Sequence, residues 1–538
     1  METYQRHFEF AQKQLQLLNP ENYQNLVELF LSACDSYAEK TAFYCLEQGL
    51  TFAELEQASR KFAAYLQSSL KLKPGDRIAI QLPNLNQYPI VAWGAIRAGL
   101  ILVNTNPLYT ERELAHQLKD SGAKVVVVLA EFLPTLEKVV AETAVEKVVV
   151  TNVFDMIEPQ PAPESSLGNI LETFPTAISI GEGIGFSDLP LTMDSVLALQ
   201  YTGGTTGAPK GAVLTHGNMF ACSQQILSSS DAFEYGKEIF IAPLPLYHIY
   251  GFNAFLVNMV FVGGTAVLIP DPRDLNSLIN TIKPFQFTGF TGVNTLFVAL
   301  LDHPEFSDID FSQLKFTISG GAALIPDVAE QWESITGNKI SEGYGMSESA
   351  AIISMNRPGA QIIGTVGQAA VGTEIKVVDD DGNECEIGSE GELLARGPQV
   401  FQGYWNRPEA TSEVLDNEGW LRTGDIAILQ DNGFLKIVDR KKDMIIVSGF
   451  NVYPNEVESV VSEHPDILEC AVVGVEDKKS AEAVKLFAVR KNEKLTEDEI
   501  IKFCRQKLTG YKVPKLVEFV VGLPKTNVGK VLRRELRK

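Results

Sequence analysis

Short runs of β-branched residues alternate with helix-length segments between residues 77 and 151, and this alternation restricts the possible folds more than any other feature. Strands are predicted at Arg77–Leu82, Leu100–Asn104, Lys124–Leu129 and Lys147–Thr151, with helices at Gln87–Ala98 and Glu111–Ser121. A strand that is followed by a helix and then by another strand is typical of a parallel sheet covered by helices. The chain is therefore expected to fold as an α/β protein.

A second alternating stretch follows residue 211, so a second sheet of the same doubly wound kind is expected. Strands are predicted at Glu238–Ala242, Thr265–Ile269, Phe287–Phe290 and Leu314–Ser319, with helices between them. The apolar stretch 252–270 is interrupted by Asn253, Asn258 and two glycines. It is read as a buried helix and a strand, because a membrane span needs about 18 or more apolar residues in a row.

The last third of the chain changes character twice. Residues 360–438 contain short strands with hairpin signals at Asp381-Gly382 and Asn432-Gly433, which favour a small antiparallel β-barrel or sheet. Strands at Glu469–Val475 and Val484–Val489 and a helix at Glu497–Leu508 predict a compact α+β unit at the end. The charged run that starts at Asp439 marks the boundary. Two domains are expected, a large one over residues 1–438 and a small mobile one over residues 439–538.

Composition excludes some function classes. The 538 residues are 45% hydrophobic, and the net charge of −22 argues against nonspecific binding of nucleic acid. Residues 439–538 are mildly basic, with 20 Lys and Arg against 16 Asp and Glu, which suits either an anionic ligand or ordinary solubility. Six scattered cysteines without a C-x-x-C pair indicate a reducing compartment. The first residues lack the apolar core of a signal peptide, so a cytoplasmic protein is expected, with contact to the inner face of a membrane and homodimer formation both left open.

The segment from Thr202 to Gly211 is rich in glycine and hydroxyl side chains and carries one lysine, Lys210. Such a loop presents backbone N–H groups, hydroxyls and a positive charge to a polyphosphate. It is not the common P-loop, because a proline precedes the lysine. The residues predicted to contact phosphate are Thr202, Gly203, Gly204, Thr205, Thr206, Gly207 and Lys210.

Five further segments carry side chains that suit a nucleotide site, although each alone also has an ordinary structural explanation. They are Pro243–Gly251 with His248, Ser319–Ala323 with Gly320 and Gly321, Glu342–Ser349 with Gly343, Tyr344, Ser347 and Glu348, Gly419–Asp425, and Pro524–Lys530. Small residues at a strand's carboxyl end admit a planar ligand, and a carboxylate commonly binds ribose hydroxyls. A lone histidine is more often structural, and an exposed lysine is usually only solvated.

The order and spacing of these segments resemble the adenylate-forming superfamily, which includes acyl-CoA synthetases, luciferases and the adenylation domains of peptide synthetases. The resemblance runs from about Thr41 to the C-terminus. The tracts Asp439–Glu456 and Thr509–Lys515 look most like those of bacterial long-chain fatty-acid–CoA ligases. Such a ligase joins a carboxylate to the α-phosphate of Mg·ATP, which gives acyl-AMP and pyrophosphate. CoA then attacks the acyl carbon, which gives the thioester and AMP.

The resemblance also implies roles for individual residues. Tyr344 would lie on the adenine, flanked by Gly320 and Gly321, and Gly343 and Ser347 belong to the same nucleotide-binding string. Asp425 would bind the ribose, Arg440 would lie near ribose and phosphate, and Glu348 would bind Mg2+. Lys530 would stabilise the adenylation transition state, and His248 would gate access of acyl chain and thiol. The C-terminal unit would turn about Lys442, after which Ser448, Gly449 and Phe450 would line the channel for the thiol.

One departure and several alternatives remain. Family members mostly have threonine at Ser347; the hydroxyl is kept, so activity is expected. Tyr250–Val262 and Phe290–Leu300 are apolar enough to line an acyl tunnel, but such stretches are equally typical of a core. The alternatives are a ligase for medium-chain or aromatic acids, a fatty acyl-AMP ligase that loads a carrier protein, a luciferase-type monooxygenase and a nucleotide sensor without activity.

Overall fold

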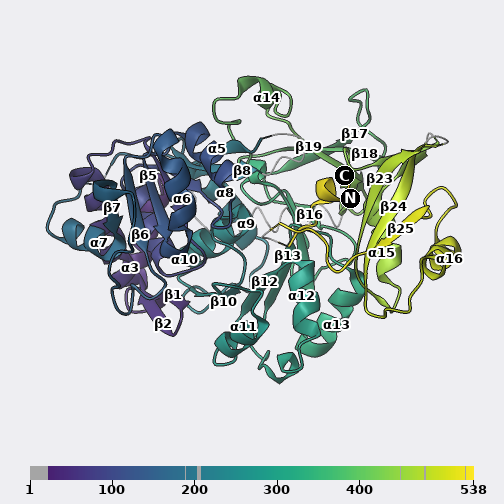
Figure 1. Ribbon diagram of the computed structural model, residues 1–538, viewed down its shortest axis with the longest axis horizontal. Helices are drawn as coiled ribbons and strands as arrows, with labels where there is room; N and C mark the ends of the chain where they lie inside the picture. The colour runs from purple at the N-terminus through teal and green to yellow at the C-terminus, as the bar shows by residue number, and fades with distance from the viewer. Residues whose placement is uncertain are drawn as a thin grey trace.

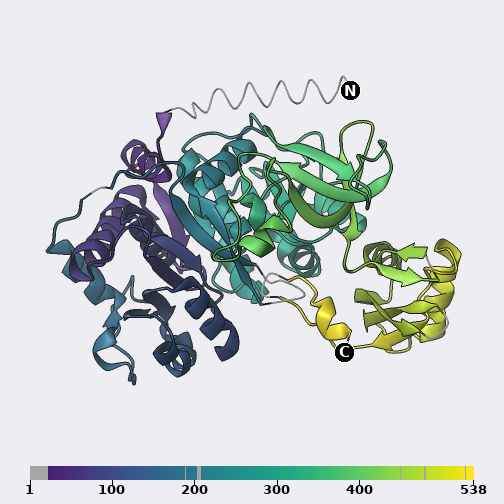
Figure 2. The ribbon, with the colours of Figure 1, turned by 90° about the horizontal axis from the view of Figure 1, so that it is seen from above.

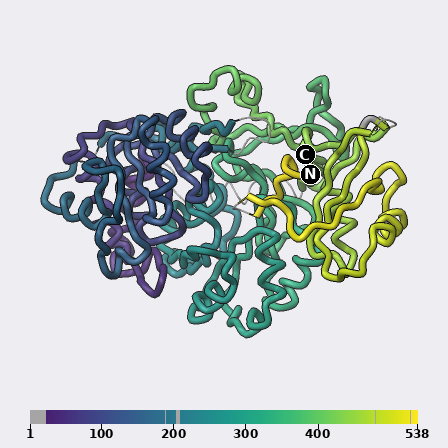
Figure 3. Tube along the Cα trace, in the orientation of Figure 1, coloured from purple at the N-terminus to yellow at the C-terminus, as the bar shows by residue number. Residues whose placement is uncertain are grey.

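A computed structural model describes residues 22–187, 189–202, 208–448, 450–477, 480–526 and 529–537. The chain forms a large N-terminal unit with two extended sheets and a third, small one, followed by a C-terminal unit at one end of the molecule (Figure 1). Figure 3 traces the same path as a tube, from the purple N-terminal region to the yellow C-terminal unit. No helix in the described ranges is long and apolar enough to cross a membrane.

The first sheet has seven strands in the order β7-β6-β5-β3-β4-β8-β9. The strands are β3 Arg77–Gln81, β4 Ile101–Asn104, β5 Val125–Leu129, β6 Lys147–Thr151, β7 Leu171–Thr173, β8 Val196–Thr202 and β9 Lys210–Thr215. All neighbours are parallel except β8 and β9. The chain winds from β3 to opposite sides of the sheet, so the doubly wound arrangement predicted for this part is confirmed.

Helices accompany this sheet in the sequence, and their ends follow local signals. They are α3 Phe52–Ala64, α4 Gln87–Arg97, α5 Glu111–Ser121, α6 Leu133–Val139 and α7 Phe174–Glu182. Helix α5 begins after Thr110, whose hydroxyl accepts from the Glu113 N–H while Glu113 caps Thr110 in return, and it ends at Gly122 with φ +62°. Helix α4 is buried along its whole length, which fits its apolar sequence.

The second sheet has nine strands in the order β16-β15-β14-β13-β12-β10-β11-β1-β2. The strands are β1 Thr41–Cys45, β2 Gln48–Thr51, β10 Ile239–Ala242, β11 Thr265–Leu268, β12 Gly289–Gly292, β13 Phe316–Gly320, β14 Ile340–Tyr344, β15 Ser354–Met355 and β16 Gln368–Ala369. Strands β10 to β14 are parallel to one another, whereas β15 is antiparallel to β14. The hairpin β1–β2 extends the sheet beyond β11, which sequence patterns did not predict.

The helices of this region are α2 Leu26–Ser36, α8 His216–Leu227, α9 Ile249–Gly251, α10 Asn258–Val262, α11 Leu275–Ile282, α12 Asn294–Leu301 and α13 Pro326–Thr336. A π-helical segment, Phe252–Val257, joins α9 to α10, and β11 follows. The buried helix and strand expected for residues 252–270 are therefore present. One continuous cluster of buried apolar side chains links both sheets, and a second cluster lies between the seven-stranded sheet and helices α5 and α6.

Residues 374–440 form a four-stranded antiparallel sheet, which is one of the two expected arrangements, and not a closed barrel. Its strands are β17 Glu374–Val378, β18 Glu390–Arg396, β19 Leu421–Leu429 and β20 Leu435–Arg440, and helix α14 Pro408–Ser412 lies in the β18–β19 connection. The order β17-β18-β19-β20 leaves two edge strands, so the sheet is open. The two predicted hairpin turns lie between β17 and β18 and between β19 and β20, with Gly382 at φ +86° and Gly433 at φ +79°.

The C-terminal unit has its own sheet and its own core. It contains β21 Ile445–Val447, β22 Phe450–Val452, β23 Ile467–Asp477, β24 Ala481–Arg490, β25 Leu516–Phe519, and helices α15 Pro454–Ser462, α16 Glu497–Lys507 and α17 Arg533–Leu536. Its buried cluster lies between Ile445 and Val517. Figure 2 shows this unit beside the large one, with the yellow final segment reaching back toward the body. The connector 441–444 joins β20 of the large unit to β21.

Candidate active site

Two neighbouring parallel strands, β13 and β14, end at the same edge of the nine-stranded sheet with Gly320 opposite Gly343. A Cβ at Gly320 would lie 3.1 Å from a ring carbon of Tyr250 and 3.3 Å from the Gly343 carbonyl oxygen. Gly321 follows with φ +81°, in the left-handed region that favours glycine. The carboxyl ends of strands are where α/β sheets bind ligands, so this edge is the predicted location for a planar group.

Tyr344, Asp425 and Arg440 come together at this edge from three strands. The Tyr344 hydroxyl donates to Asp425 Oδ2 at 2.5 Å, and Arg440 Nε lies 3.7 Å from Asp425 Oδ1. Asp425 and Arg440 face each other across β19 and β20. Burial raises the pKa of Asp425, while Arg440 acts against that rise. The structure thus holds a carboxylate beside an aromatic ring and a guanidinium, which suits a ribose and a phosphate.

Glu348 is a buried carboxylate with cations nearby. It lies in the short turn Ser347–Ser349, is 5% exposed, and accepts a hydrogen bond from the Tyr404 hydroxyl at 2.6 Å. Burial raises its pKa, and the Tyr404 hydrogen bond, Arg440 and Lys210 oppose that rise. Lys210 Nζ lies over the Tyr404 ring, 5.0 Å from its centroid. In the part of the chain that the structure describes, Glu348 belongs to no group of three or more acidic, histidine or cysteine side chains that could hold a metal ion, so it could offer a cation one carboxylate only.

Lys530 enters this group from the C-terminal unit. It lies on a turn in which Thr526 N donates to the Lys530 carbonyl at 2.7 Å and Lys530 N donates to Thr526 Oγ1 at 3.1 Å. Its side chain lies along Gly321, where a Cβ would be 3.3 Å from Lys530 Cε. The pKa of Lys530 is lowered to about 8, because burial and, to a lesser extent, Arg440 lower it more than Asp425 and Glu348 raise it. The lysine is therefore placed within the electrostatic reach of all three groups.

The turn that carries Lys530 fits closely onto the large unit. Gly529 has φ +77°, and a Cβ there would lie 2.6 Å from Thr295 Oγ1 at the start of α12. Any larger residue at this position would be strained by its backbone and would also meet Thr295. Glycine at position 529 thus allows the lysine-bearing turn to approach the sheet edge.

His248 and Tyr250 form a wall beside the same edge. His248 precedes α9, and its Nδ1 accepts from the Tyr250 N–H at 3.3 Å. Burial lowers the pKa of His248 to about 3, with a contribution from Lys530. The imidazole is therefore neutral, and it is near enough to Lys530 to sense its charge. Tyr250 donates to the Ile318 carbonyl at 3.3 Å, which fixes the ring against Gly320.

The remaining candidates are divided between the site and its surroundings. Thr202 at the end of β8 pairs with Lys210 at the start of β9, while Gly203–Gly207 lie outside the described residues, as does Gly449. Ser347 begins the turn that holds Glu348. Lys442 lies in the connector. Ser448 and Phe450 are exposed on the C-terminal unit, where Phe450 stacks on Tyr511 at 4.7 Å, so they do not share the enclosed position of Lys530.

Sequence reasoning missed three residues at the site. Tyr404 approaches Glu348 because it bridges to Ala212 on β9. The one signal in the sequence that could have pointed to it is the Gly-Tyr-Trp string at 403–405. Thr295 lies in an ordinary helix start and carried no signal. Glu342 lies in the predicted segment Glu342–Ser349, but no sequence pattern indicates that burial raises its pKa to about 8.

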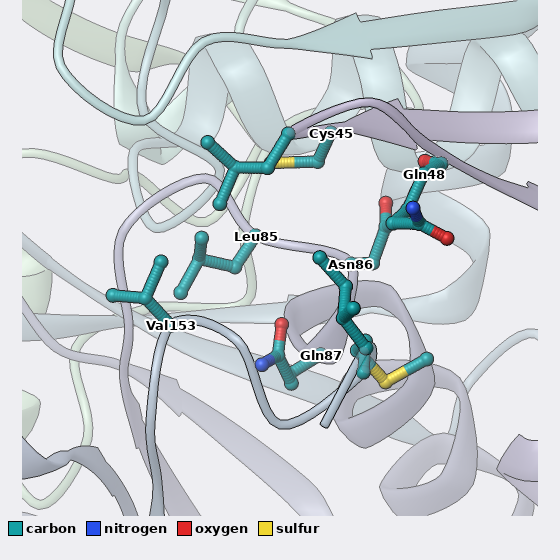
Figure 4. A pocket seen from close by; sticks show the side chains of 9 residues that line it. Cys45, Gln48, Leu85, Asn86, Gln87 and Val153 are labelled. Atoms are coloured by element: carbon teal, nitrogen blue, oxygen red, sulfur yellow. The ribbon is translucent and has the colours of Figure 1, made fainter. Parts of the chain in front are cut away.

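A small pocket lies elsewhere, beside the β1–β2 hairpin (Figure 4). It is lined by Cys45, Leu85, Asn86 and Gln87, among others.

Comparison with known proteins gives a consistent assignment. The family model for the AMP-binding enzyme matches residues 30–405, and the model for the AMP-binding enzyme C-terminal domain matches residues 456–530. The chain is 48% identical to a long-chain-fatty-acid–CoA ligase of Escherichia coli O157:H7, covering 97% of this chain and 95% of that protein. A ligase with the same description from Bacillus subtilis (strain 168) is 37% identical, with 95% and 94% covered.

Among solved structures, the chain resembles the anthranilate CoA ligase AuaEII in complex with anthranoyl-AMP. The TM-score is 0.87 at 28% sequence identity, and 96% of each chain is covered. The likeness extends over both units, including the C-terminal one.

Proposed function

Because the chain belongs to the AMP-binding enzyme family, we propose that it is an AMP-forming ligase that activates a long-chain fatty acid with ATP and transfers it to CoA. The acyl preference rests on relatives such as those of E. coli and B. subtilis, which are described as long-chain-fatty-acid–CoA ligases. The observation that carries the proposal is the position of Lys530, which a separate unit places beside Gly321 and close to Asp425 and Glu348.

In the first half-reaction, the fatty-acid carboxylate attacks the α-phosphorus of ATP and the bond to pyrophosphate breaks. Tyr344 and the glycines at 320 and 321 hold the adenine, and Asp425 binds the ribose hydroxyls. Lys530 and Arg440 place positive charge next to the phosphorus that accumulates negative charge in the transition state. Thr202 to Lys210 bind the pyrophosphate that leaves.

The Glu348 carboxylate suits Mg2+, because its oxygens are the hard ligands that this ion prefers and the Tyr404 hydroxyl holds them in place. Phosphate oxygens and water would supply the remaining ligands. Bound there, Mg2+ would neutralise phosphate charge and orient the leaving pyrophosphate. Among the described residues there is no group of three or more His, Cys, Asp or Glu that would bind a metal ion without the nucleotide. The fit is therefore to an ion that arrives with ATP.

In the second half-reaction the thiolate of CoA attacks the acyl carbon and AMP leaves. In this structure Lys530 fills the site, and Ser448 and Phe450 face solvent. The thiol step therefore requires a turn of the C-terminal unit about Lys442, which withdraws Lys530 and brings residues 448–450 to the site. His248, neutral and next to Lys530, lies where acyl chain and thiol would pass.

A panel of carboxylic acids tests this function directly. ATP–pyrophosphate exchange is measured with saturated acids of increasing length and with aromatic acids, and acyl-CoA formation is then followed after CoA is added. Exchange that is greatest with long-chain acids, followed by CoA-dependent release of AMP, is expected. Absence of exchange with every acid would overturn the proposal, a preference for anthranilate-like acids would reassign the substrate, and transfer only to a phosphopantetheinyl protein would indicate a carrier-loading ligase.

The cellular setting is part of the same proposal. All cysteines in the described ranges are free, which is consistent with a reducing cytoplasm. The substrates are small molecules, namely fatty acid, ATP and CoA. Contact with the inner face of a membrane would give access to a poorly soluble acid, and flotation with anionic lipid vesicles measures it. Sedimentation equilibrium distinguishes a monomer from a homodimer.

A further inference from the structure

We infer that Asp439 is a positioning residue that holds the C-terminal unit in the orientation in which Lys530 occupies the site. This inference rests on the proposed two-step function. Asp439 belongs to β20 of the large unit, two residues before the connector, and its side chain is fully buried. Its Oδ2 accepts a hydrogen bond from the Asn455 N–H at 2.7 Å, and its Oδ1 lies 3.6 Å from Arg533 Nη1. Both partners belong to the C-terminal unit.

The contact with Asn455 serves as the cap of a helix. Asn455 is the second residue of α15. Tyr453, the residue that precedes the helix, makes no capping hydrogen bond with its side chain. The first N–H groups of a helix have no partner within it, and they attract negative charge. Asp439 supplies that charge from the other unit, so α15 is capped only while the two units keep this orientation.

Arg533 extends the contact to Lys530. It follows Lys530 by three residues, and its Nη2 donates to Asn455 Oδ1 at 2.6 Å and to Glu458 Oε2 at 2.8 Å. Asn455 and Glu458 both belong to α15. The lysine-bearing segment is thus attached to α15, and α15 is attached to Asp439.

A second contact crosses the connector in the same way. The Tyr453 hydroxyl donates to Glu390 Oε2, on β18 of the large unit, at 2.9 Å. By contrast, Asp443 lies just after Lys442 and binds Arg537 Nη2 at 2.9 Å and Arg533 Nη1 at 3.6 Å. A turn of the C-terminal unit about Lys442 separates Asp439 from its two partners and Tyr453 from Glu390. The same turn carries Asp443 along with both arginines.

This difference gives a matched pair of variants, Asp439→Asn and Asp443→Asn, which remove the same charge opposite the same arginine. Two rates are measured on the full chain: pyrophosphate exchange, and thioester formation from supplied acyl-AMP and CoA. Asp439→Asn replaces a charged acceptor with a neutral amide, whose hydrogen bonds are weaker, so it is expected to lower the ratio of exchange to thioester formation about fivefold or more. Asp443→Asn is expected to leave that ratio unchanged. Equal ratios in both variants would overturn the inference, because a merely structural role lowers both rates together.

Tyr453→Phe provides a second test if Asp439→Asn does not fold. It removes one hydroxyl and is expected to shift the ratio in the same direction, by roughly threefold. An unchanged ratio in Tyr453→Phe, with Asp439→Asn unfolded, counts against the inference. The wild-type rates separate this outcome from failure of the proposed function. If the wild-type protein forms no acyl-AMP with any acid, the proposed function is wrong. If it carries out both steps and the ratio of exchange to thioester formation is unchanged in the variants, only the role of Asp439 is wrong.

Discussion

The side chain of Lys530 lies along Gly321, so close that a methyl group at position 321 would come within 3.3 Å of Lys530 Cε. The two residues are 209 positions apart and belong to different units, yet the glycine that follows β13 leaves the space that the lysine occupies. Under the proposed function, a charge that acts in one half-reaction only is thereby carried on a unit that can leave the site.

Lys530→Ala is expected to lower pyrophosphate exchange by a factor of about 100 or more, since removal of one group that stabilises transition-state charge typically has that effect. Thioester formation from supplied acyl-AMP should change by less than about threefold, because Lys530 has left the site in that step. Both are measured as initial rates. Lys525→Ala is the control, since Lys525 pairs with Glu469 inside the C-terminal unit. Equal losses in the two half-reactions would contradict the assignment.

The pH dependence of adenylation is expected to follow Lys530, whose pKa is lowered to about 8. The amine is charged below that pH and loses its charge as the pH rises through it. The value of kcat/KM for ATP, which reports the free enzyme, should therefore fall above pH 8 by about tenfold per pH unit. Lys530→Arg, whose guanidinium stays charged, should be slower but lack this fall. A wild-type profile that stays flat to pH 10 would show that another group supplies the charge.

Tyr404→Phe should weaken the dependence of adenylation on Mg2+. The change removes the hydrogen bond that holds the buried Glu348 carboxylate, so the Mg2+ concentration for half-maximal exchange should rise about tenfold, the usual scale for loss of a group that orients a metal ligand. Tyr65→Phe is the control, because the Tyr65 hydroxyl is buried without a hydrogen-bond partner among the described residues. If the Mg2+ concentration for half-maximal exchange is unchanged in Tyr404→Phe, Glu348 is not a ligand of the metal.

Gly529→Ala should slow adenylation without unfolding the protein. An added methyl would be strained at φ +77° and would meet Thr295 Oγ1, and strain of this kind costs about 1–3 kcal/mol, or roughly 5- to 150-fold in rate. Gly522→Ala is the matched control in the same unit, because its Cβ would meet nothing within 4 Å. Thermal melting checks that both variants fold. Similar exchange rates in the two variants would mean that the lysine-bearing turn does not need its close fit.

Most regular elements could be predicted because their signals are local. Helix α5 and strand β6 have the predicted bounds, because each is fixed by signals within it or next to it. These are a capping box and a terminal glycine for α5, and a run of valines for β6. Strand β12 begins two residues later than predicted. Phe287 precedes the strand but is buried in an aromatic cluster with Phe290 and Phe311. A buried apolar residue in the loop before a strand looks the same in the sequence as one within the strand, so the predicted start was too early.

The unpredicted parts depend on contacts between distant segments. The hairpin β1–β2 is fixed by the pairing of Phe43 with Ala266, more than 200 residues away, and no pattern within residues 41–51 indicates that partner. Tyr404 likewise depends on its bridge to Ala212. The resemblance implied that Tyr344, Glu348, Asp425 and Lys530 share a site, and in the structure these residues lie near one another. The hydrogen bonds and pKa shifts among them follow from burial, which a linear pattern does not contain.

The large unit and the C-terminal unit have separate buried clusters that share no residue. Substitutions in the large unit, including the wall made by His248 and Tyr250, therefore leave the buried cluster of the C-terminal unit untouched, although that wall lies beside Lys530 itself. Under the proposed function, the wall could change to suit another carboxylic acid without a change in the core of the unit that carries Lys530. At the boundary between the units, by contrast, a substitution of Asp439 or Thr295 alters a contact to which both units contribute.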